Sequence, residues 1–172
     1  MYRNSYLEID LDKLKANAQC FIRKNNKKLI GVIKANGYGI IDYMEAEALK
    51  EVGVDFFAVS SLDEALHLRK HNIEGHILIL GQVPPERMDL IREQDLSIVT
   101  VSEEFLKQCD LKNVKVHLKL DTGMNRIGID TEYAKNILEL LKEKGALIEG
   151  VMSHFSSADE DEEYSKKQIG RA

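Results

Sequence analysis

Residue types that can do chemistry stand at the ends of three apolar runs. Lys34 closes the run LIGVIK, Lys119 and Asp121 close VKVHLKLD, and His154 closes LIEGVMSH. Amine, carboxylate and imidazole groups transfer protons or attack carbonyl carbons. Where such runs form parallel strands with crossover helices, the carboxyl ends of the strands build the active site. The sequence therefore predicts one site assembled from the ends of several strands.

Lys34 follows a run, Ile30–Ile33, that is typical of a strand buried on both faces. Burial disfavours a charged ammonium, and the neutral amine is the form that condenses with an aldehyde cofactor. A lysine at the end of a strand also commonly extends its ammonium to solvent without any chemical role. Taken alone, this run fits the second interpretation better than the first.

The run Val114–Leu120 alternates strictly, with Lys115, His117 and Lys119 on one face and apolar residues on the other. In a closed barrel the helices cover the outside, so the polar row would face the lumen and require charged or hydrogen-bonding partners there. An edge strand with one face in water gives the same pattern. The alternation leaves both interpretations open.

The loop Asp121–Gly128 has glycines near both ends, a shape that can turn Arg126 back over the mouth of the preceding strand. A guanidinium there can hold a phenolate, a carboxylate or a phosphate. The plainer alternatives are an Arg126 in solvent and a His154 with a structural role, and each residue taken singly fits these better. The hypothesis of a site rests on the clustering of these residues at strand ends.

Six apolar runs separated by amphipathic segments predict alternating strands and helices. The predicted strands are Leu29–Ala35, Phe56–Ser60, Ile77–Gly81, Leu96–Val101, Val114–Leu120 and Leu147–Ser153. The predicted helices are Leu11–Lys24, Asp42–Val52, Leu62–His71, Pro85–Gln94, Ser102–Cys109 and Thr131–Gly145, with Ser102 and Thr131 as N-caps and the acidic run Asp159–Glu163 opening a last helix. This alternation predicts an α/β fold with parallel strands, either an open doubly wound sheet or a barrel.

Composition favours a soluble one-domain protein that binds a small molecule. The chain has 172 residues, of which 44% are hydrophobic, and a net charge of -5 with scattered basic residues, which disfavours nucleic acid as a partner. Cys20 and Cys109 are far apart and have no paired Cys or His, so we expect no metal site and reduced thiols in a cytoplasmic protein. No signal peptide or apolar membrane-spanning run is present, so no membrane partner is expected.

Three motifs resemble, in order and spacing, signature stretches of the alanine racemase family: VIKANGYG (Val32–Gly39), KLDTGMNRIG (Lys119–Gly128) and SHFSSADE (Ser153–Glu160). The resemblance extends over nearly all of the chain, including YLEIDLDKLKAN and FFAVSSLDEALHLR. It implies a (β/α)8 TIM-barrel-like fold of the pyridoxal 5'-phosphate (PLP) enzymes of fold type III. Residues 1–172 would supply about six of the eight βα units of that barrel, without the C-terminal β domain.

The resemblance also implies roles for individual residues. Lys34 would form the Schiff base with PLP and serve as one of two catalytic bases, while Tyr38 would contact the cofactor phosphate. Arg126 would hydrogen-bond the phenolic oxygen of the cofactor and help to bind substrate. Lys119 matches a lysine that is often carbamylated and then orients the arginine. His154 would lie close to the cofactor ring.

Two positions depart from the family pattern, because Ile40 stands where histidine is common and Asn125 where glycine is common. The family implies a longer enzyme, a homodimer whose partner subunit supplies a tyrosine base, which interconverts L- and D-alanine for peptidoglycan. We therefore expect this chain to be an N-terminal part that is inactive alone. The alternatives are a serine racemase of the vancomycin-resistance type and a non-catalytic PLP-binding barrel protein.

These expectations combine into one arrangement. The strands should be parallel with right-handed crossovers, and Lys34, Lys119, Arg126 and His154 should lie at one end. A barrel stopped after six strands leaves its first and last strands with unpaired backbone groups, which invite pairing. We therefore expect the isolated chain to associate with a second copy or with a separate chain that supplies the missing strands.

Overall fold

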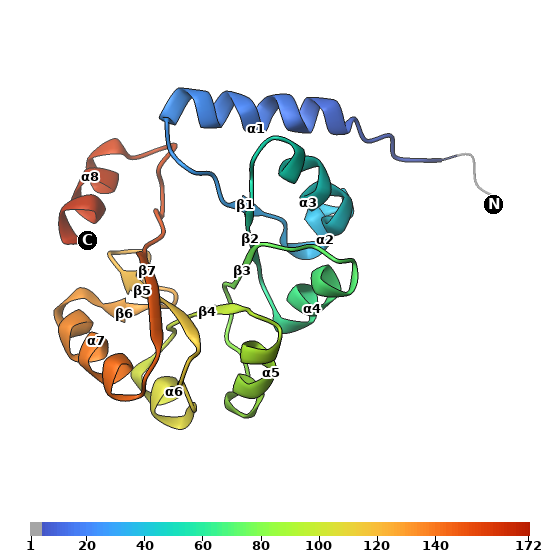
Figure 1. Cartoon of the computed structure of the whole chain (residues 1–172). Coiled ribbons are helices and arrows are strands. Elements are labelled where there is room, and N and C mark those ends of the chain that lie inside the picture. The colour runs from blue at the N-terminus through green and yellow to red at the C-terminus, as the bar shows by residue number, and fades with distance from the viewer. Residues whose placement is uncertain (1–4) are drawn as a thin grey trace. The chain divides into compact units, whose positions relative to one another are not determined.

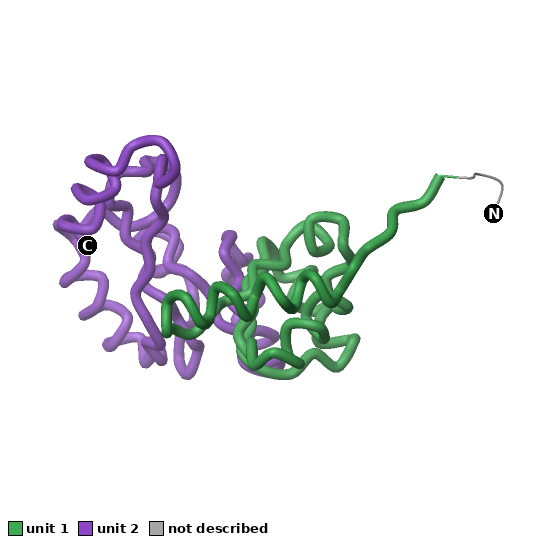
Figure 2. Tube along the Cα trace, turned by 90° about the horizontal axis from the view of Figure 1, so that it is seen from above, with its two compact units in different colours: residues 1–77 green, residues 78–172 purple. Residues whose placement is uncertain are grey.

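The structure, a computed structural model, describes residues 5–172 and divides into two compact units, the first ending at Ile77 and the second beginning at Leu78 (Figure 2). In each unit, parallel strands are followed by helices (Figure 1). The predicted alternation of parallel strands and helices is confirmed.

The first unit contains one strand pair with helices around it. Its elements are α1 (Leu11–Asn25), β1 (Gly31–Val32), α2 (Lys34–Tyr38), α3 (Asp42–Glu51), β2 (Phe56–Val59), α4 (Leu62–Lys70) and the start of β3 (His76–Ile79). Strands β1 and β2 are parallel, with Gly31 opposite Phe57. Burying apolar side chains stabilises this unit, whose core includes Ala46, Leu49, Phe57, Val59 and Leu68.

Strand β1 is shorter than the predicted run Leu29–Ala35, and the prediction of burial on both faces is wrong. Gly31 and Ile33 are buried, whereas Ile30 and Val32 are exposed. The buried face packs tightly, because a Cβ atom on Gly31 would lie 2.9 Å from Leu49 Cδ1 and 3.1 Å from Phe57 Cδ1. The other face of β1 has no comparable cover among residues 5–77.

The strand ends early because the next residues form a left-handed turn. Ala35, Asn36, Gly37 and Tyr38 have φ angles of 54°, 54°, 61° and 54°. This conformation costs an L-residue about 1–2 kcal/mol, and consecutive residues rarely adopt it. Contacts from other elements must therefore hold the turn, which directly follows Lys34.

The second unit is organised around strand β5. Its elements are the end of β3, η1 (Pro85–Arg87), α5 (Met88–Glu93), β4 (Ser97–Val99), α6 (Glu103–Gln108), β5 (Lys115–Asp121), β6 (Ile129–Asp130), η2 (Thr131–Tyr133), α7 (Ala134–Glu143), β7 (Leu147–Met152) and α8 (Glu162–Arg171). Strand β3 pairs with β4, β4 with β5, and β5 with β7, all in parallel. Strands therefore pair in chain order, as in a (β/α) barrel.

Strand β6 was not predicted. It pairs with the end of β5, Leu120 opposite Ile129 and Asp121 opposite Asp130. Gly128 allows this close approach, because it has a φ of 134° and a Cβ atom there would lie 3.0 Å from Asp121 N. The loop therefore returns over the end of β5, as its glycine pattern suggested.

The N-caps of three helices can be compared with the caps predicted from the sequence. Ser102 Oγ accepts a hydrogen bond from Phe105 N at 3.2 Å, so this predicted N-cap is confirmed. Thr131 is wrong as a cap, because β6 ends at Asp130, whose carboxylate accepts from Glu132 N at 3.2 Å and opens η2. In the acidic run, Asp161 accepts from Tyr164 N at 2.8 Å and opens α8, as predicted.

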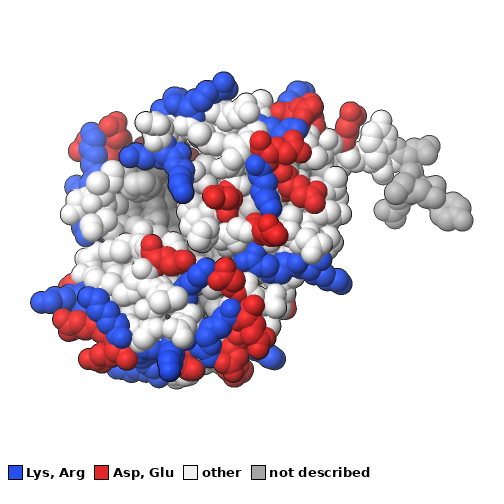
Figure 3. All heavy atoms as spheres, viewed as in Figure 1, with Lys and Arg blue, Asp and Glu red and all other residues white. Residues whose placement is uncertain are grey.

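The surface is mixed in charge. On the face drawn in Figure 3, Lys and Arg are interspersed with Asp and Glu and do not form a basic stripe. This distribution agrees with the scattered basic residues of the sequence. Within residues 5–172, every helix is too short or too polar to span a membrane.

Candidate active site

The predicted site residues lie near or just after the carboxyl ends of strands in both units. Ile33 alone separates Lys34 from β1, Lys119 lies near the end of β5, and Arg126 lies in the loop after β5. Ser153 alone separates His154 from β7, whose last residue, Met152, lies opposite Lys119. Lys34 and Tyr38 belong to the first unit, and the other three residues to the second.

Backbone hydrogen bonds anchor the chain on both sides of Lys34. Ile33 N donates to Ala58 O of β2 at 3.0 Å, and Gly37 N donates to Ile33 O at 2.9 Å. Lys34 itself is half-buried, and Tyr38 is exposed. An amine in this place can be reached by a small molecule while its backbone stays fixed.

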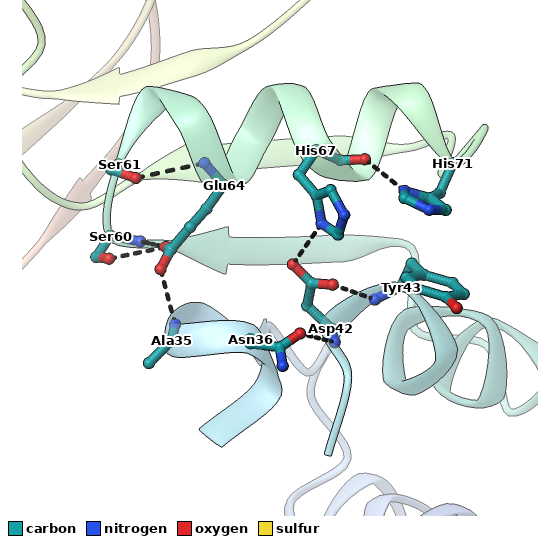
Figure 4. A network of polar contacts seen from close by, with 9 residues as sticks. All are labelled: Ala35, Asn36, Asp42, Tyr43, Ser60, Ser61, Glu64, His67 and His71. Carbon is teal, nitrogen blue, oxygen red and sulfur yellow. Dashed lines mark hydrogen bonds and ion pairs between the residues drawn. The ribbon is translucent and has the colours of Figure 1, made fainter. Parts of the chain in front are cut away.

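Glu64, at the start of α4, ties the turn after Lys34 to the end of β2 (Figure 4). Its Oε1 accepts from Ala35 N at 2.8 Å, while Oε2 accepts from Ser60 N and from Ser60 Oγ, each at 2.7 Å. Burial would raise the pKa of Glu64, but the hydrogen bonds from Ser60, Ala35 and Ser61 outweigh it and hold that pKa below its usual value. The carboxylate is therefore the form that fits this place.

Sequence reasoning missed Glu64, although a signal for it exists. Ser61 caps α4, its Oγ accepting from Glu64 N at 3.3 Å, and a serine three residues before a glutamate is the spacing of a capping box. In an ordinary capping box the glutamate returns to the backbone of its own helix start. Here the same carboxylate also reaches Ala35 in another loop.

A second set of contacts supports the turn from α3 (Figure 4). Asn36 Oδ1 accepts from Asp42 N at 3.4 Å, and the buried Asp42 carboxylate accepts from Tyr43 N at 2.8 Å and lies 3.1 Å from His67 Nδ1. The ring of His71 stacks on Tyr43 with 4.1 Å between centroids. Helices α3 and α4 are thus joined beside the turn.

Glu45 lies directly beneath Gly37. A Cβ atom on Gly37 would lie 2.5 Å from Glu45 Oε2 and 3.2 Å from Asp42 N, and Gly37 has a φ of 61°, so a larger residue there would displace the carboxyl group and strain the backbone. Glu45 is 8% exposed, and its Oε2 has no hydrogen-bond partner among residues 5–172. Burial, with a contribution from the Asp42 carboxylate, raises the pKa of Glu45 to about 7. Glu45 therefore retains a proton close to neutrality.

Lys119 occupies a different environment in the second unit. Lys119 is 6% exposed, and its backbone N donates to the buried Thr100 Oγ1 at 2.8 Å. Burial lowers the pKa of Lys119, the Arg126 guanidinium lowers it further, and Asp121 acts in the opposite direction. Two cationic side chains therefore influence each other at the end of β5, an arrangement that suits an anion.

The polar row of β5 has polar partners on the neighbouring strands. Glu149 Oε2 accepts from Ser97 Oγ at 2.6 Å and lies 3.5 Å from His117 Nε2, while Glu149 Oε1 lies 4.0 Å from Lys115 Nζ. His117 is 9% exposed and faces Gly150, where a Cβ atom would lie 2.9 Å from His117 Nδ1. Strand β5 pairs with β4 on one side and β7 on the other, so the alternative of an edge strand is wrong. That the row faces the lumen of a barrel stays a prediction.

Backbone groups shape the loop that carries Arg126. Asp121 Oδ1 accepts from Gly123 N at 2.9 Å and from Asn125 N at 3.1 Å. Burial would raise the pKa of Asp121, but these backbone donors outweigh it and hold that pKa below its usual value. Asn125 has a φ of 55°, which asparagine tolerates better than most residues. Its replacement of the family's common glycine is therefore compatible with this turn.

His154 is exposed and lines a pocket of about 230 Å³, together with Thr122, Ser153, Phe155, Gln168, Ile169 and Ala172. The buried Gln168 of α8 donates from Nε2 to His154 O at 3.1 Å and accepts at Oε1 from Ser156 N at 3.0 Å. Sequence reasoning missed Gln168, because nothing in its local pattern distinguishes it from a surface residue of an amphipathic helix.

Comparisons with known proteins agree on one family. The family model described as alanine racemase, N-terminal domain, matches residues 9–172. An alanine racemase of Staphylococcus epidermidis is 41% identical over 169 residues, covering 92% of this chain and 44% of the relative. One of Staphylococcus saprophyticus is 38% identical and covers 97% of this chain and 46% of the relative. The chain thus spans less than half the length of these curated relatives.

Solved structures show the same relationship. The alanine racemase of E. faecalis superposes with a TM-score of 0.88 at 36% identity, over 95% of this chain and 47% of that one. The alanine racemase of Clostridium difficile 630 superposes with a TM-score of 0.89 at 31% identity, over 99% of this chain and 48% of that one. The TIM-barrel-like fold class is confirmed, and the chain belongs to the family of alanine racemase N-terminal domains.

Proposed function

We propose that residues 1–172 form the PLP-binding part of an alanine racemase, in which Lys34 attaches the cofactor. The observation that carries this proposal is the placement of Lys34, a half-buried amine after the first strand, anchored by β2 and followed by a left-handed turn. Strained backbone of this kind concentrates at functional sites. The family supports the same role.

The polar groups fit the chemistry of PLP. The aldehyde requires an amine, which Lys34 supplies, and the anionic oxygens of the cofactor require cations and hydrogen-bond donors. Arg126 supplies such a cation, and the exposed Tyr38 hydroxyl can donate to a phosphate. His154 lines a pocket at the strand end of the second unit and is proposed to lie beside the cofactor ring.

When bound, PLP withdraws electrons from the Cα atom of an attached amino acid and so acidifies the proton on that carbon. The Lys34 amine would accept the Cα proton on one face of the substrate in one direction of the reaction, and would deliver a proton to that same face in the reverse direction. Arg126 holds the anionic oxygen and the substrate carboxylate in a fixed orientation. Racemisation needs a second base on the opposite face, which we propose comes from the partner subunit of a homodimer.

We further propose that Lys119 is carbamylated. Its lowered pKa favours the neutral amine, which attacks CO2 to form a carbamate and releases one proton. The new carboxylate would convert the repulsion between Lys119 and Arg126 into an attraction. It would also remove the cost of a buried cation in β5.

The substrates we propose are L- and D-alanine, because the relatives and solved structures carry that name. The product D-alanine would serve peptidoglycan synthesis. A racemase for serine would give the same attachment of PLP but a different preference between the two amino acids, and a non-catalytic binding barrel would attach PLP without turnover.

Titration of the chain with PLP tests the attachment. We expect a visible absorbance band of the covalently attached cofactor, and its complete loss in Lys34→Ala. Lys50→Ala removes an exposed lysine of α3 and is the matched control, which should behave as the wild type. A band that persists in Lys34→Ala, or PLP bound without any covalent attachment, would refute the role of Lys34.

A further inference from the structure

We propose that Glu64 is a positioning residue for Lys34, which it orients through the backbone amide of Ala35. The inference rests on the proposed function of Lys34, because it concerns how that amine is presented. Glu64 does not itself touch the cofactor or substrate in this account. It fixes the peptide that follows the lysine.

The carboxylate joins two segments that are far apart in the sequence, the turn after β1 and the connection from β2 to α4 (Figure 4). It accepts hydrogen bonds from Ala35 N after β1 and from Ser60 after β2, while its own backbone is capped by Ser61 at the start of α4. Each of the two oxygens has a donor at 2.7 or 2.8 Å. The ends of β1 and β2 are therefore held in one arrangement by one side chain.

This arrangement leaves the backbone around Lys34 little freedom. Ile33 N is bonded to Ala58 O on one side, and Ala35 N is bonded to Glu64 on the other. Ala35 has a φ of 54° and a ψ of 48°, a conformation that alanine by itself disfavours. Without the carboxylate, the Ala35 peptide would relax toward more favourable angles and would carry the Cα–Cβ direction of Lys34 with it.

The negative charge and the second acceptor oxygen are both needed. Glutamine has one acceptor oxygen and one donor NH2 group, so it can serve either the Ala35 N–H or the Ser60 N–H but not both. Aspartate is one methylene shorter and cannot span the same gap without moving α4. Glu64→Gln is therefore the least disruptive variant that removes half of the bridge.

Asp63→Asn is the matched control. Asp63 also lies in the first turn of α4, is exposed, and loses the same charge in the same helix dipole. A role for Glu64 limited to capping α4 would make the two variants differ only in stability. A positioning role predicts a local effect on Ala35 and Lys34 that Asp63→Asn lacks.

The experiment has two readouts on the folded chain. Hydrogen exchange of the Ala35 amide should become about tenfold faster in Glu64→Gln, the change expected for one lost charged hydrogen bond. Reductive labelling with pyridoxal, mapped by peptide mass spectrometry, should change several-fold in rate at Lys34 relative to Lys50. Both readouts should be unchanged in Asp63→Asn.

A rescue variant separates positioning from general damage. Glycine adopts left-handed angles readily, so Ala35→Gly in the Glu64→Gln background should restore much of the Lys34 labelling rate. Equal labelling of Lys34 in wild type and Glu64→Gln, or a loss shared by all lysines that Ala35→Gly does not recover, would overturn the proposal.

A measurement on the wild type decides the case even where Glu64→Gln fails to fold. The NMR chemical shift of the Ala35 amide proton should change with pH at the same midpoint as that of the Glu64 carboxyl carbon. This midpoint should lie below the usual pKa of glutamate. An Ala35 shift independent of that titration would overturn the inference. If PLP attaches elsewhere, the proposed function fails, while Ala35 exchange and Lys34 labelling still decide the positioning role.

Discussion

Two lysines of this chain stand at the carboxyl ends of parallel strands, yet their surroundings are opposite. Lys34 is half-buried and precedes a left-handed turn held by Glu64, whereas Lys119 is 6% exposed inside the seven-residue strand β5. The first is the lysine that we propose reacts with the cofactor. The second is buried, and the like charge of Arg126 disfavours its charged form. A position at the end of a strand does not by itself determine the chemical role of a lysine. The local backbone conformation and the neighbouring charges determine its exposure and its pKa.

The largest effect is expected in the loop that brings Arg126 back toward Lys119. Gly128→Ala places a Cβ atom 3.0 Å from Asp121 N at a φ of 134°, so β6 should separate from β5. We expect a loss of about 2–3 kcal/mol in the free energy of unfolding by urea denaturation. Gly170→Ala, which meets no atom within 4 Å, is the control and should cost little. A Gly128→Ala chain as stable as the Gly170→Ala chain would contradict this account of the loop.

The turn beside Lys34 makes a prediction about pH. The pKa of Glu45 is raised from 4.5 to about 7 in the folded chain, so the folded state binds more protons between these values. The free energy of unfolding should therefore fall as pH rises from about 4.5 to 7. Glu45→Gln should remove this slope and stabilise the chain at pH 8 by about 2 kcal/mol, with little difference at pH 4. Parallel stability curves of the two proteins would show that Glu45 is not buried as described.

For Lys119 we expect a smaller effect on the free energy of unfolding, with the opposite dependence on pH. Its lowered pKa means that the folded state binds fewer protons than the unfolded state, so stability should rise with pH toward the ordinary pKa of lysine, 10.5. In buffer free of CO2, Lys119→Met should stabilise the chain near pH 7 by about 1 kcal/mol, and less near pH 10.

The same variant tests the carbamate. With ¹³C-bicarbonate, the wild type should show a carbamate carbon resonance that Lys119→Met lacks. A resonance that survives in Lys119→Met would assign the modification to another lysine. No resonance in the wild type would leave Lys119 as an unmodified buried amine and refute the proposed carbamylation.

The contrast between the lysines also shows what sequence reasoning can reach. The alternation of β5 predicted that Lys115, His117 and Lys119 share one face, and Glu149 of β7 lies beside the first two of them. This succeeded because the period of a strand fixes which residues share a face. The three motifs predicted the family directly, since each combines several residues at fixed spacing.

The surroundings of Lys34 could not be predicted in the same way. Ala35 and Tyr38 have no intrinsic preference for left-handed angles, and only tertiary contacts from Glu64, Asp42 and Glu45 explain the turn. The expectation of a strand through Ala35 failed for this reason. Thr131 failed as a cap because the preceding Asp130 ends β6 and opens the turn instead. Local propensity was overridden in both places by a neighbour in space or in sequence.

The most direct test of the central claim is to reduce the chain with borohydride after incubation with PLP and to map the modified peptide by mass spectrometry. The account predicts a single pyridoxyl phosphate group on Lys34, in the peptide that contains VIKANGYG. Lys119 should remain unlabelled because it is enclosed in β5. Labelling of Lys119, or labelling spread over the exposed lysines with none preferred, would contradict the assignment of Lys34 as the residue that attaches the cofactor.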